Sequence, residues 1–326
     1  MSYKMKTAVL SALIAVLSLI YILTFVFDPR KQERNAFALL DPKLLNLADR
    51  IEIFGASGGN TGEEIVLIRR NNIWFFQAGL SYHPEWYSDS IPSELPVKQS
   101  RVDDLLAILS RKDIYPQRAA TIEGRERLGL IEGYASRIIV RGGAGLPLLD
   151  LLIGTADALN RSVYFRMADR NEIHSGEDRF TIFTESRPNS WYDLRLFPPE
   201  SNLMVESVQH VEVTLPGNNS FFLRRGGGSW IIPGNESAEL DNIKVEAWLR
   251  SVLEAEGEDF GELLPTEGGI TLGFGDGTIR IMQFSSADEN KRRNVTVSGS
   301  PLTYILSEWT VNRLFRESSY FYKTAR

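Results

Sequence analysis

The stretch "NNIWFFQAG", Asn71–Gly79, decides the fold, because a related stretch, "GGSWIIPG", returns at Gly227–Gly234. In each, a turn of asparagines or glycines is followed by a tryptophan inside a short apolar run and then by another glycine. Turn residues that bound short runs of β-branched and aromatic residues are typical of antiparallel strands. The two stretches therefore predict two copies of one structural unit.

The elements around these stretches follow the same order in both halves of the chain. Apolar residues alternate in short runs before a helix with the sequence "VDDLLAILS", and again before a helix with the sequence "NIKVEAWLRSVL". Alternation with period two indicates strands, and apolar spacings of three and four indicate helices. Trp74 then aligns with Trp230, and Val102 with Val245. A repeat this long favours tandem domains over a solenoid, which repeats every ~20–50 residues.

These patterns together predict an α+β protein. We expect an N-terminal transmembrane helix followed by two tandem divergent repeats, each an antiparallel sheet with a helix. The expected boundaries are 1–30 for the anchor, 31–47 for a stalk, 48–200 for the first repeat and 201–326 for the second. Residues 300–317 are predicted to form a terminal helix.

The composition excludes several classes of function. The chain has 326 residues, a net charge of -6 and no cysteine. Disulfides, thiol nucleophiles and thiolate zinc sites are therefore excluded. The basic residues are scattered rather than gathered in one footprint, so we expect no binding to nucleic acid.

The residues Thr7–Phe27 form an uncharged apolar run of about 21 residues, or roughly 31 Å as a helix, which is long enough to span a bilayer. A cleaved secretory signal is the alternative, but its apolar region is shorter and ends at a small-x-small site, whereas this run ends in "TFVFDPR". We therefore expect an uncleaved anchor that contacts the lipid bilayer through residues 7–27. Ala8, Ala12 and Ala15 recur at helical spacing, so they could form a face that contacts another membrane helix.

Five segments in order carry a family resemblance: "VDDLLAILS", "RERLGL", "LLDLLIG", "SVYFRM" and "SWYDLRLF". With the amino-terminal span, they resemble the domain-of-unknown-function 4340 family. The resemblance implies a bacterial envelope protein, often encoded beside the ATPase, permease and auxiliary subunits of a gliding-type ABC transporter, with no established catalytic residue. It implies a location at the bacterial inner membrane, single-pass, with the bulk of the chain extracytoplasmic. The expected partners are the permease and an auxiliary subunit.

Three glycine clusters could suggest phosphate binding: Arg141–Gly145, Arg224–Ser229 and Gly273–Gly277. A phosphate cradle needs its glycines between a strand and the start of a helix. Each of these clusters is followed by another predicted strand, so we interpret them as hairpin turns.

No pattern of metal or catalytic residues is present in the sequence. His83, His174 and His210 are far apart and lack the close spacing of zinc ligands. The acidic run at 254–262 lacks the alternating ligands and central glycine of a calcium loop. We therefore expect no catalytic, cofactor-binding or metal-binding residue, and no enzyme.

One loop has no counterpart of similar length in the second half. The residues 79–96 place Tyr82, His83, Trp86 and Tyr87 between prolines and glycine. Aromatic residues with a polar tip are enriched where proteins bind partners, so these four are candidate contacts. The alternative is that Trp86 folds back over its own sheet.

We interpret the chain as a non-catalytic, membrane-anchored accessory or assembly subunit of an ABC-type envelope transport complex. Two alternatives stay open. A periplasmic module that binds a glycan or lipid would have a large apolar pocket between the copies. An envelope hydrolase would have two carboxylates that converge only in the fold, with opposed pKa shifts.

Overall fold

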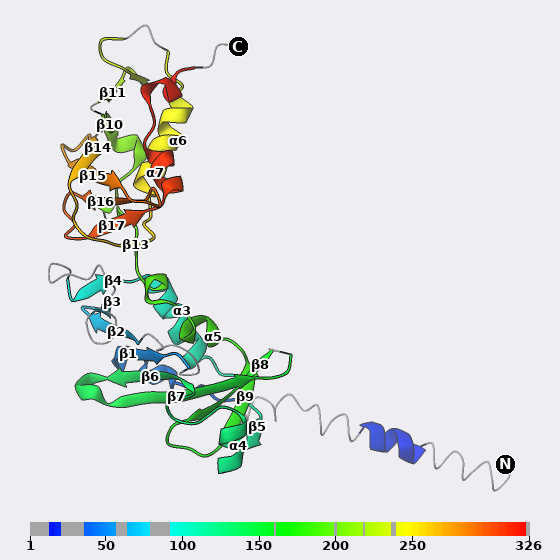
Figure 1. Cartoon of the computed structure of the whole chain (residues 1–326). Coiled ribbons are helices and arrows are strands. Elements are labelled where there is room, and N and C mark those ends of the chain that lie inside the picture. The colour runs from blue at the N-terminus through cyan, green and yellow to red at the C-terminus, as the bar shows by residue number, and fades with distance from the viewer. Residues whose placement is uncertain are drawn as a thin grey trace, which may run out of the picture. The chain divides into compact units, whose positions relative to one another are not determined.

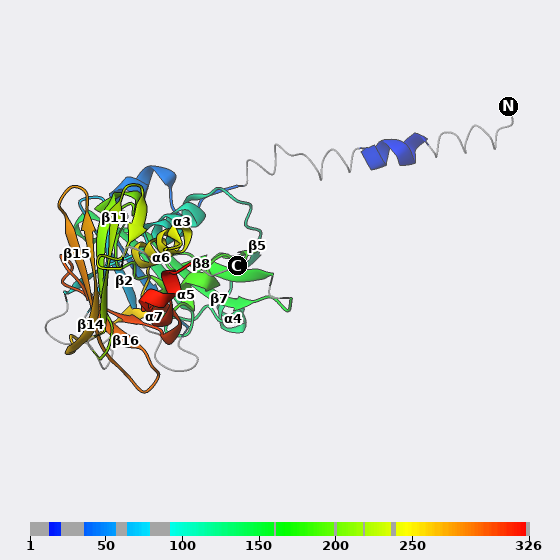
Figure 2. The same ribbon diagram turned by 90° about the horizontal axis from the view of Figure 1, so that it is seen from above.

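The structure is a computed structural model, shown in Figures 1 and 2. Residue contacts divide the chain into two compact units, residues 1–62 with 100–186 and residues 63–99 with 187–326. We call them the first and the second unit. The described residues are 13–20, 36–56, 64–78, 92–159, 161–198, 201–217, 219–235 and 239–323.

The protein is mostly β, so the predicted α+β class is wrong. One antiparallel sheet has nine strands in the order β4-β3-β2-β1-β6-β7-β8-β9-β5. Its strands are β1 (Ala48–Phe54), β2 (Ile65–Arg70), β3 (Ile73–Gln77), β4 (Glu94–Pro96), β5 (Gln117–Ala119), β6 (Ser136–Gly142), β7 (Pro147–Ala156), β8 (Ser162–Met167) and β9 (Ile173–Glu177).

The other antiparallel sheet has eight strands in the order β12-β11-β10-β14-β15-β16-β17-β13. If β4 is left out, the two sheets have the same strand order, with β3 corresponding to β12, β1 to β10 and β5 to β13. The two predicted copies are therefore present, but each is built mostly of strands. The repeat boundaries 48–200 and 201–326 stay a prediction. The strands are β10 (Val208–Thr214), β11 (Ser220–Gly226), β12 (Ser229–Ile231), β13 (Asp259–Phe260), β14 (Thr266–Phe274), β15 (Ile279–Ala287), β16 (Arg293–Val297) and β17 (Thr303–Leu306).

Helices in the described ranges are short. The longest two, α3 and α6, have 12 residues each. Periodicity overestimated the terminal helix in particular, because residues 300–317 form β17 and then α7. The α-helices are α3 (Gln99–Ser110), α4 (Ile122–Arg127), α5 (Thr181–Thr184), α6 (Asn242–Leu253) and α7 (Glu308–Leu314).

The two tryptophan stretches form equivalent hairpins. Trp74 on β3 lies opposite Arg69 on β2, and Trp230 on β12 lies opposite Arg225 on β11. The guanidinium carbon lies 6.0 Å from the ring centroid in the first pair and 5.0 Å in the second, within reach of a cation–π interaction. Both tryptophans are buried, at 4% and 3% exposure.

An amide side chain joins each hairpin to the helix that follows it. The backbone N–H of Trp74 donates to Gln99 Oε1, and the backbone N–H of Trp230 donates to Asn242 Oδ1, each over 2.9 Å. Gln99 is the first residue of α3, and Asn242 is the first residue of α6. The same local contact therefore fixes the start of the helix in both copies.

Helices α6 and α7 cover one face of the eight-stranded sheet (Figures 1 and 2). Asp241 is the N-cap of α6, because its side chain accepts from the backbone N–H groups of Ile243 and Lys244. Its buried face includes Val245 and Trp248. The Trp248 Nε1–H donates to the Leu314 carbonyl over 2.9 Å, which ties α6 to α7.

The predicted membrane anchor is not supported. Most of Thr7–Phe27 lies outside the described residues, and the described part is helical over residues 13–20. No helix in the described residues is long and apolar enough to cross a membrane. The predictions of a transmembrane helix and of a single-pass inner-membrane location are therefore wrong.

Candidate functional site

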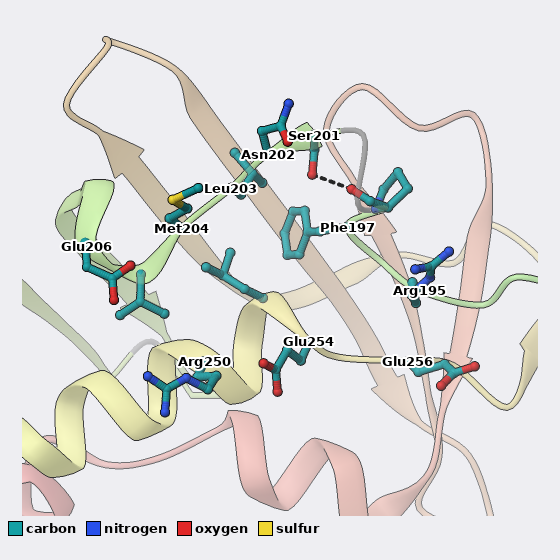
Figure 3. A pocket seen from close by; sticks show the side chains of 13 residues that line it. Arg195, Phe197, Ser201, Asn202, Leu203, Met204, Glu206, Arg250, Glu254 and Glu256 are labelled. Atoms are coloured by element: carbon teal, nitrogen blue, oxygen red, sulfur yellow. Dashed lines mark hydrogen bonds between the residues drawn. The ribbon is translucent and has the colours of Figure 1, made fainter.

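A cavity of about 470 Å³ lies in the second unit, at the C-terminal end of α6 (Figure 3). Two parts of the chain that are distant in sequence form it, residues 195–198 with 201–206, and residues 250–256. The lining consists of Arg195, Phe197, Pro198, Ser201, Asn202, Leu203, Met204, Val205, Glu206, Arg250, Leu253, Glu254 and Glu256.

The cavity has an apolar floor. Phe197, Val205 and Leu253 are buried apolar residues of the lining. Leu203 is half-buried, and Met204 is 62% exposed. The site therefore offers both a buried apolar surface and reachable apolar side chains, which suits an apolar group of a partner or ligand.

Backbone hydrogen bonds hold the two segments together. The Leu196 N–H donates to the Ala255 carbonyl over 3.0 Å, and the Gly257 N–H donates to the Leu194 carbonyl over 2.8 Å. The chain then turns at Pro198, whose carbonyl accepts from the Ser201 hydroxyl over 2.6 Å (Figure 3). This turn brings the residues that follow it back over the end of α6.

Charged side chains surround the apolar floor. The Arg195 guanidinium forms a two-point ion pair with Asp193, and Lys98 Nζ lies 2.8 Å from Glu256 Oε1. Glu254 and Arg250 are exposed at the end of α6. A polar rim around an apolar centre is the usual arrangement of a protein-binding site.

Burial raises the pKa of Asp259, the carboxyl that follows this site on β13, although its side chain accepts the Phe260 N–H over 2.9 Å. Because the pKa of Asp259 is higher in the folded than in the unfolded chain, there is a pH range between the two pKa values. In that range the folded chain binds more protons than the unfolded chain does. The free energy of unfolding therefore falls as the pH rises through that range.

Asp259→Asn is expected to stabilise the protein at neutral pH, because the amide has no charge to bury and can still accept the Phe260 N–H. Below the ordinary aspartate pKa of about 3.9 the two proteins should be equally stable. Thermal unfolding of both proteins from acidic to neutral pH measures the difference. A stability difference that does not change with pH would contradict the assignment.

The predicted contact residues fall almost entirely outside the described part of the chain. Tyr82, His83, Trp86 and Tyr87 lie outside it, as do Ala8 and Ala12, so those predictions stay predictions. Ala15 lies in the helix over residues 13–20 and is exposed there.

The described histidines have structural neighbours. His174 Nδ1 lies 2.9 Å from the Tyr115 carbonyl oxygen, and its ring stacks on Phe165. His210 stacks on Phe222 at 5.7 Å between ring centroids. Within the described residues, no three His, Cys, Asp or Glu side chains are grouped so that they could hold a metal ion.

The three glycine clusters all join consecutive strands, as predicted. They lie between β6 and β7, between β11 and β12, and between β14 and β15. Gly227, Gly228 and Gly277 have φ values of 59°, 85° and 86°, which glycine adopts readily in hairpin turns. Sequence reasoning missed the cavity, although the apolar run Leu203–Val205 between Asn202 and Glu206 was a signal of it.

Comparison with known proteins gives one family. The sequence model of the family described as "Domain of unknown function (DUF4340)" matches residues 86–268. The chain belongs to the DUF4340 family. The DUF4340 match includes every residue that lines the cavity. No curated protein and no solved structure matches the chain.

Proposed function

We propose that this DUF4340 protein is a non-catalytic accessory subunit of an ABC-type envelope transport complex. It binds another subunit of that complex through the cavity at the end of α6. The supporting observation is the cavity itself, which combines an apolar floor with a charged rim. The family resemblance to proteins encoded beside transporter subunits suggests which partners to test.

The proposal rests on how protein interfaces obtain their affinity. A few side chains that enter well-packed apolar pockets contribute most of it, and the polar residues around them exclude water. Phe197, Val205 and Leu253 provide such a pocket. A partner side chain that fills it would bury apolar area worth about 25 cal/mol per Å².

A second candidate function is the binding of a small apolar ligand. The cavity volume of about 470 Å³ supports it, since ligand pockets generally measure about 300–1,000 Å³. Native mass spectrometry of the purified full chain would detect a bound small molecule. The hydrolase alternative stays a prediction.

Met204→Glu is expected to weaken co-purification of the permease, ATPase and auxiliary subunit with the tagged full chain. The change places a charge beside the apolar floor, and we expect a loss of affinity of at least about tenfold, or 1.4 kcal/mol. Met204 is exposed, so the fold should be unaffected. Quantitative co-purification after co-expression measures the effect.

Leu146→Glu is the matched control, because Leu146 is 60% exposed and lies in the first unit. This control should retain all the partners that the unchanged protein retains. If Met204→Glu co-purifies the same subunits in the same amounts, the cavity is not the docking site.

A further inference from the structure

Trp309 is an unusually exposed tryptophan. It is 68% exposed on α7, whereas Trp74, Trp191, Trp230 and Trp248 are all buried. The buried face of α7 carries Thr310, Val311 and Leu314 instead. A large aromatic side chain left in water is typical of an interaction surface, because burying it stabilises a complex.

Three cations lie against the aromatic rings of this region. Arg313 Cζ is 4.7 Å from the Trp309 ring centroid. Arg316 Cζ is 4.7 Å, and Lys244 Nζ 5.8 Å, from the Tyr320 ring centroid. We call these five residues the basic-aromatic surface. Among the described residues, no carboxylate forms an ion pair with any of the three cations, so their charge is available to a partner.

The basic-aromatic surface rests on a fixed support. Phe321 is fully buried, and its ring packs edge-on against both Trp248 and Tyr320, at 5.1 and 5.2 Å between centroids. The Asp241 N–H donates to the Phe321 carbonyl over 2.8 Å, which joins this segment to the start of α6. A surface that is already rigid loses less conformational entropy on binding.

A complementary surface lies on the same unit, just beyond the other end of α6. Residues 258–264 include Glu258, Glu262, Leu263 and Leu264, and all four are exposed, Leu263 at 78%. We call these four residues the acidic-leucine edge. Within the described residues neither glutamate has an ion-pair partner. Asn294 Nδ2 donates to the Glu262 carbonyl over 2.7 Å and holds the segment in place.

We propose that the basic-aromatic surface of one copy binds the acidic-leucine edge of a second copy. The two surfaces carry opposite charges, and each exposes large apolar side chains beside them. Lys244, Arg313 and Arg316 carry positive charge in a chain whose net charge is -6, and none of them is in an ion pair in the part of the chain that the structure describes, although Lys244 Nζ also donates to the Tyr322 carbonyl over 3.4 Å. They therefore attract acidic groups of a partner.

Geometry favours contact between copies rather than within one. Lys244 lies in the first turn of α6, and the acidic-leucine edge follows the last turn. The 12-residue helix, about 18 Å long, separates them. The association joins two different surfaces, head to tail, and therefore can continue beyond a dimer.

Sedimentation of the full chain at rising concentration tests the proposal. We expect oligomers that grow with concentration and weaken as salt is raised, because salt screens the attraction between charges. Trp309→Ser removes one surface and Leu263→Ser the other, and both residues are exposed, so both variants should fold. Each variant alone should associate at least tenfold more weakly, whereas Leu159→Ser, an equally exposed leucine of the first unit, should have no effect.

Mixing the two variants provides the decisive measurement. The Trp309→Ser variant keeps its acidic-leucine edge, and the Leu263→Ser variant keeps its basic-aromatic surface, so these two can still bind each other. An equal mixture of the variants should therefore form a one-to-one dimer and nothing larger. Variants that stay monomeric when mixed would overturn the proposal, as would oligomers that neither substitution affects. A full chain that stays monomeric would overturn it too, even if the basic-aromatic surface bound an added acidic polymer such as poly-glutamate.

Discussion

Replacing Trp230 with alanine is expected to lower the free energy of unfolding of the second unit by about 3–5 kcal/mol, the range for removing a large aromatic side chain from a core. Trp230 is buried on β12, opposite Arg225 and next to the start of α6. Its removal leaves a cavity where hairpin and helix meet. Urea unfolding of the full chain, monitored by circular dichroism, measures the loss in the free energy of unfolding.

Trp309→Ala is the matched control within the same unit. Its side chain is exposed, and surface substitutions usually change stability by no more than about 0.5 kcal/mol. Trp74→Ala should resemble Trp230→Ala, because the two hairpins make the same contacts. Equal effects of Trp230→Ala and Trp309→Ala would contradict the assignment of Trp230 to the core.

Local sequence patterns were sufficient to find the hairpins and their helices. The tryptophan stretches, the glycine turns and the apolar spacing of the helices are all recognisable from neighbouring residues, and their order revealed the duplication. The fold class was wrong because short apolar runs are ambiguous between strand and helix. At residues 303–306, Tyr304 and Leu306 are buried and alternate with half-buried residues, so this part of the predicted terminal helix is a strand.

The cavity could not be predicted in the same way. It depends on backbone pairing between Leu196 and Ala255, which are far apart in sequence. Their contact follows from the path of the chain between the sheets, and no local pattern reports that path. The exposure of Trp309 could not be predicted locally either, because the orientation of α7 determines which of its side chains are buried, and the buried ones are Thr310, Val311 and Leu314.

Gly154→Ala is expected to destabilise the first unit by about 3 kcal/mol, at the upper end of the usual cost of overpacking. A Cβ at this position would lie 2.1 Å from the Leu128 carbonyl oxygen and 2.9 Å from Leu130 Cγ. The Thr155 N–H donates to that same carbonyl over 2.9 Å, so the oxygen cannot withdraw without losing a hydrogen bond. Thermal unfolding of the full chain measures the change.

Gly273→Ala tests whether the loss of stability depends on the obstructing atom being main chain or side chain. Its Cβ would lie 1.9 Å from His210 Cε1, but the obstructing atoms belong to a ring that can rotate away. In a His210→Ala background, Gly273→Ala should therefore cost much less than it does alone, a coupling that a double-mutant cycle measures. No side-chain deletion can relieve Gly154→Ala in the same way, because its closest obstacle is main chain. If Gly154→Ala costs no more than Gly273→Ala, the chain over residues 128–130 yields more easily than its hydrogen bonds indicate.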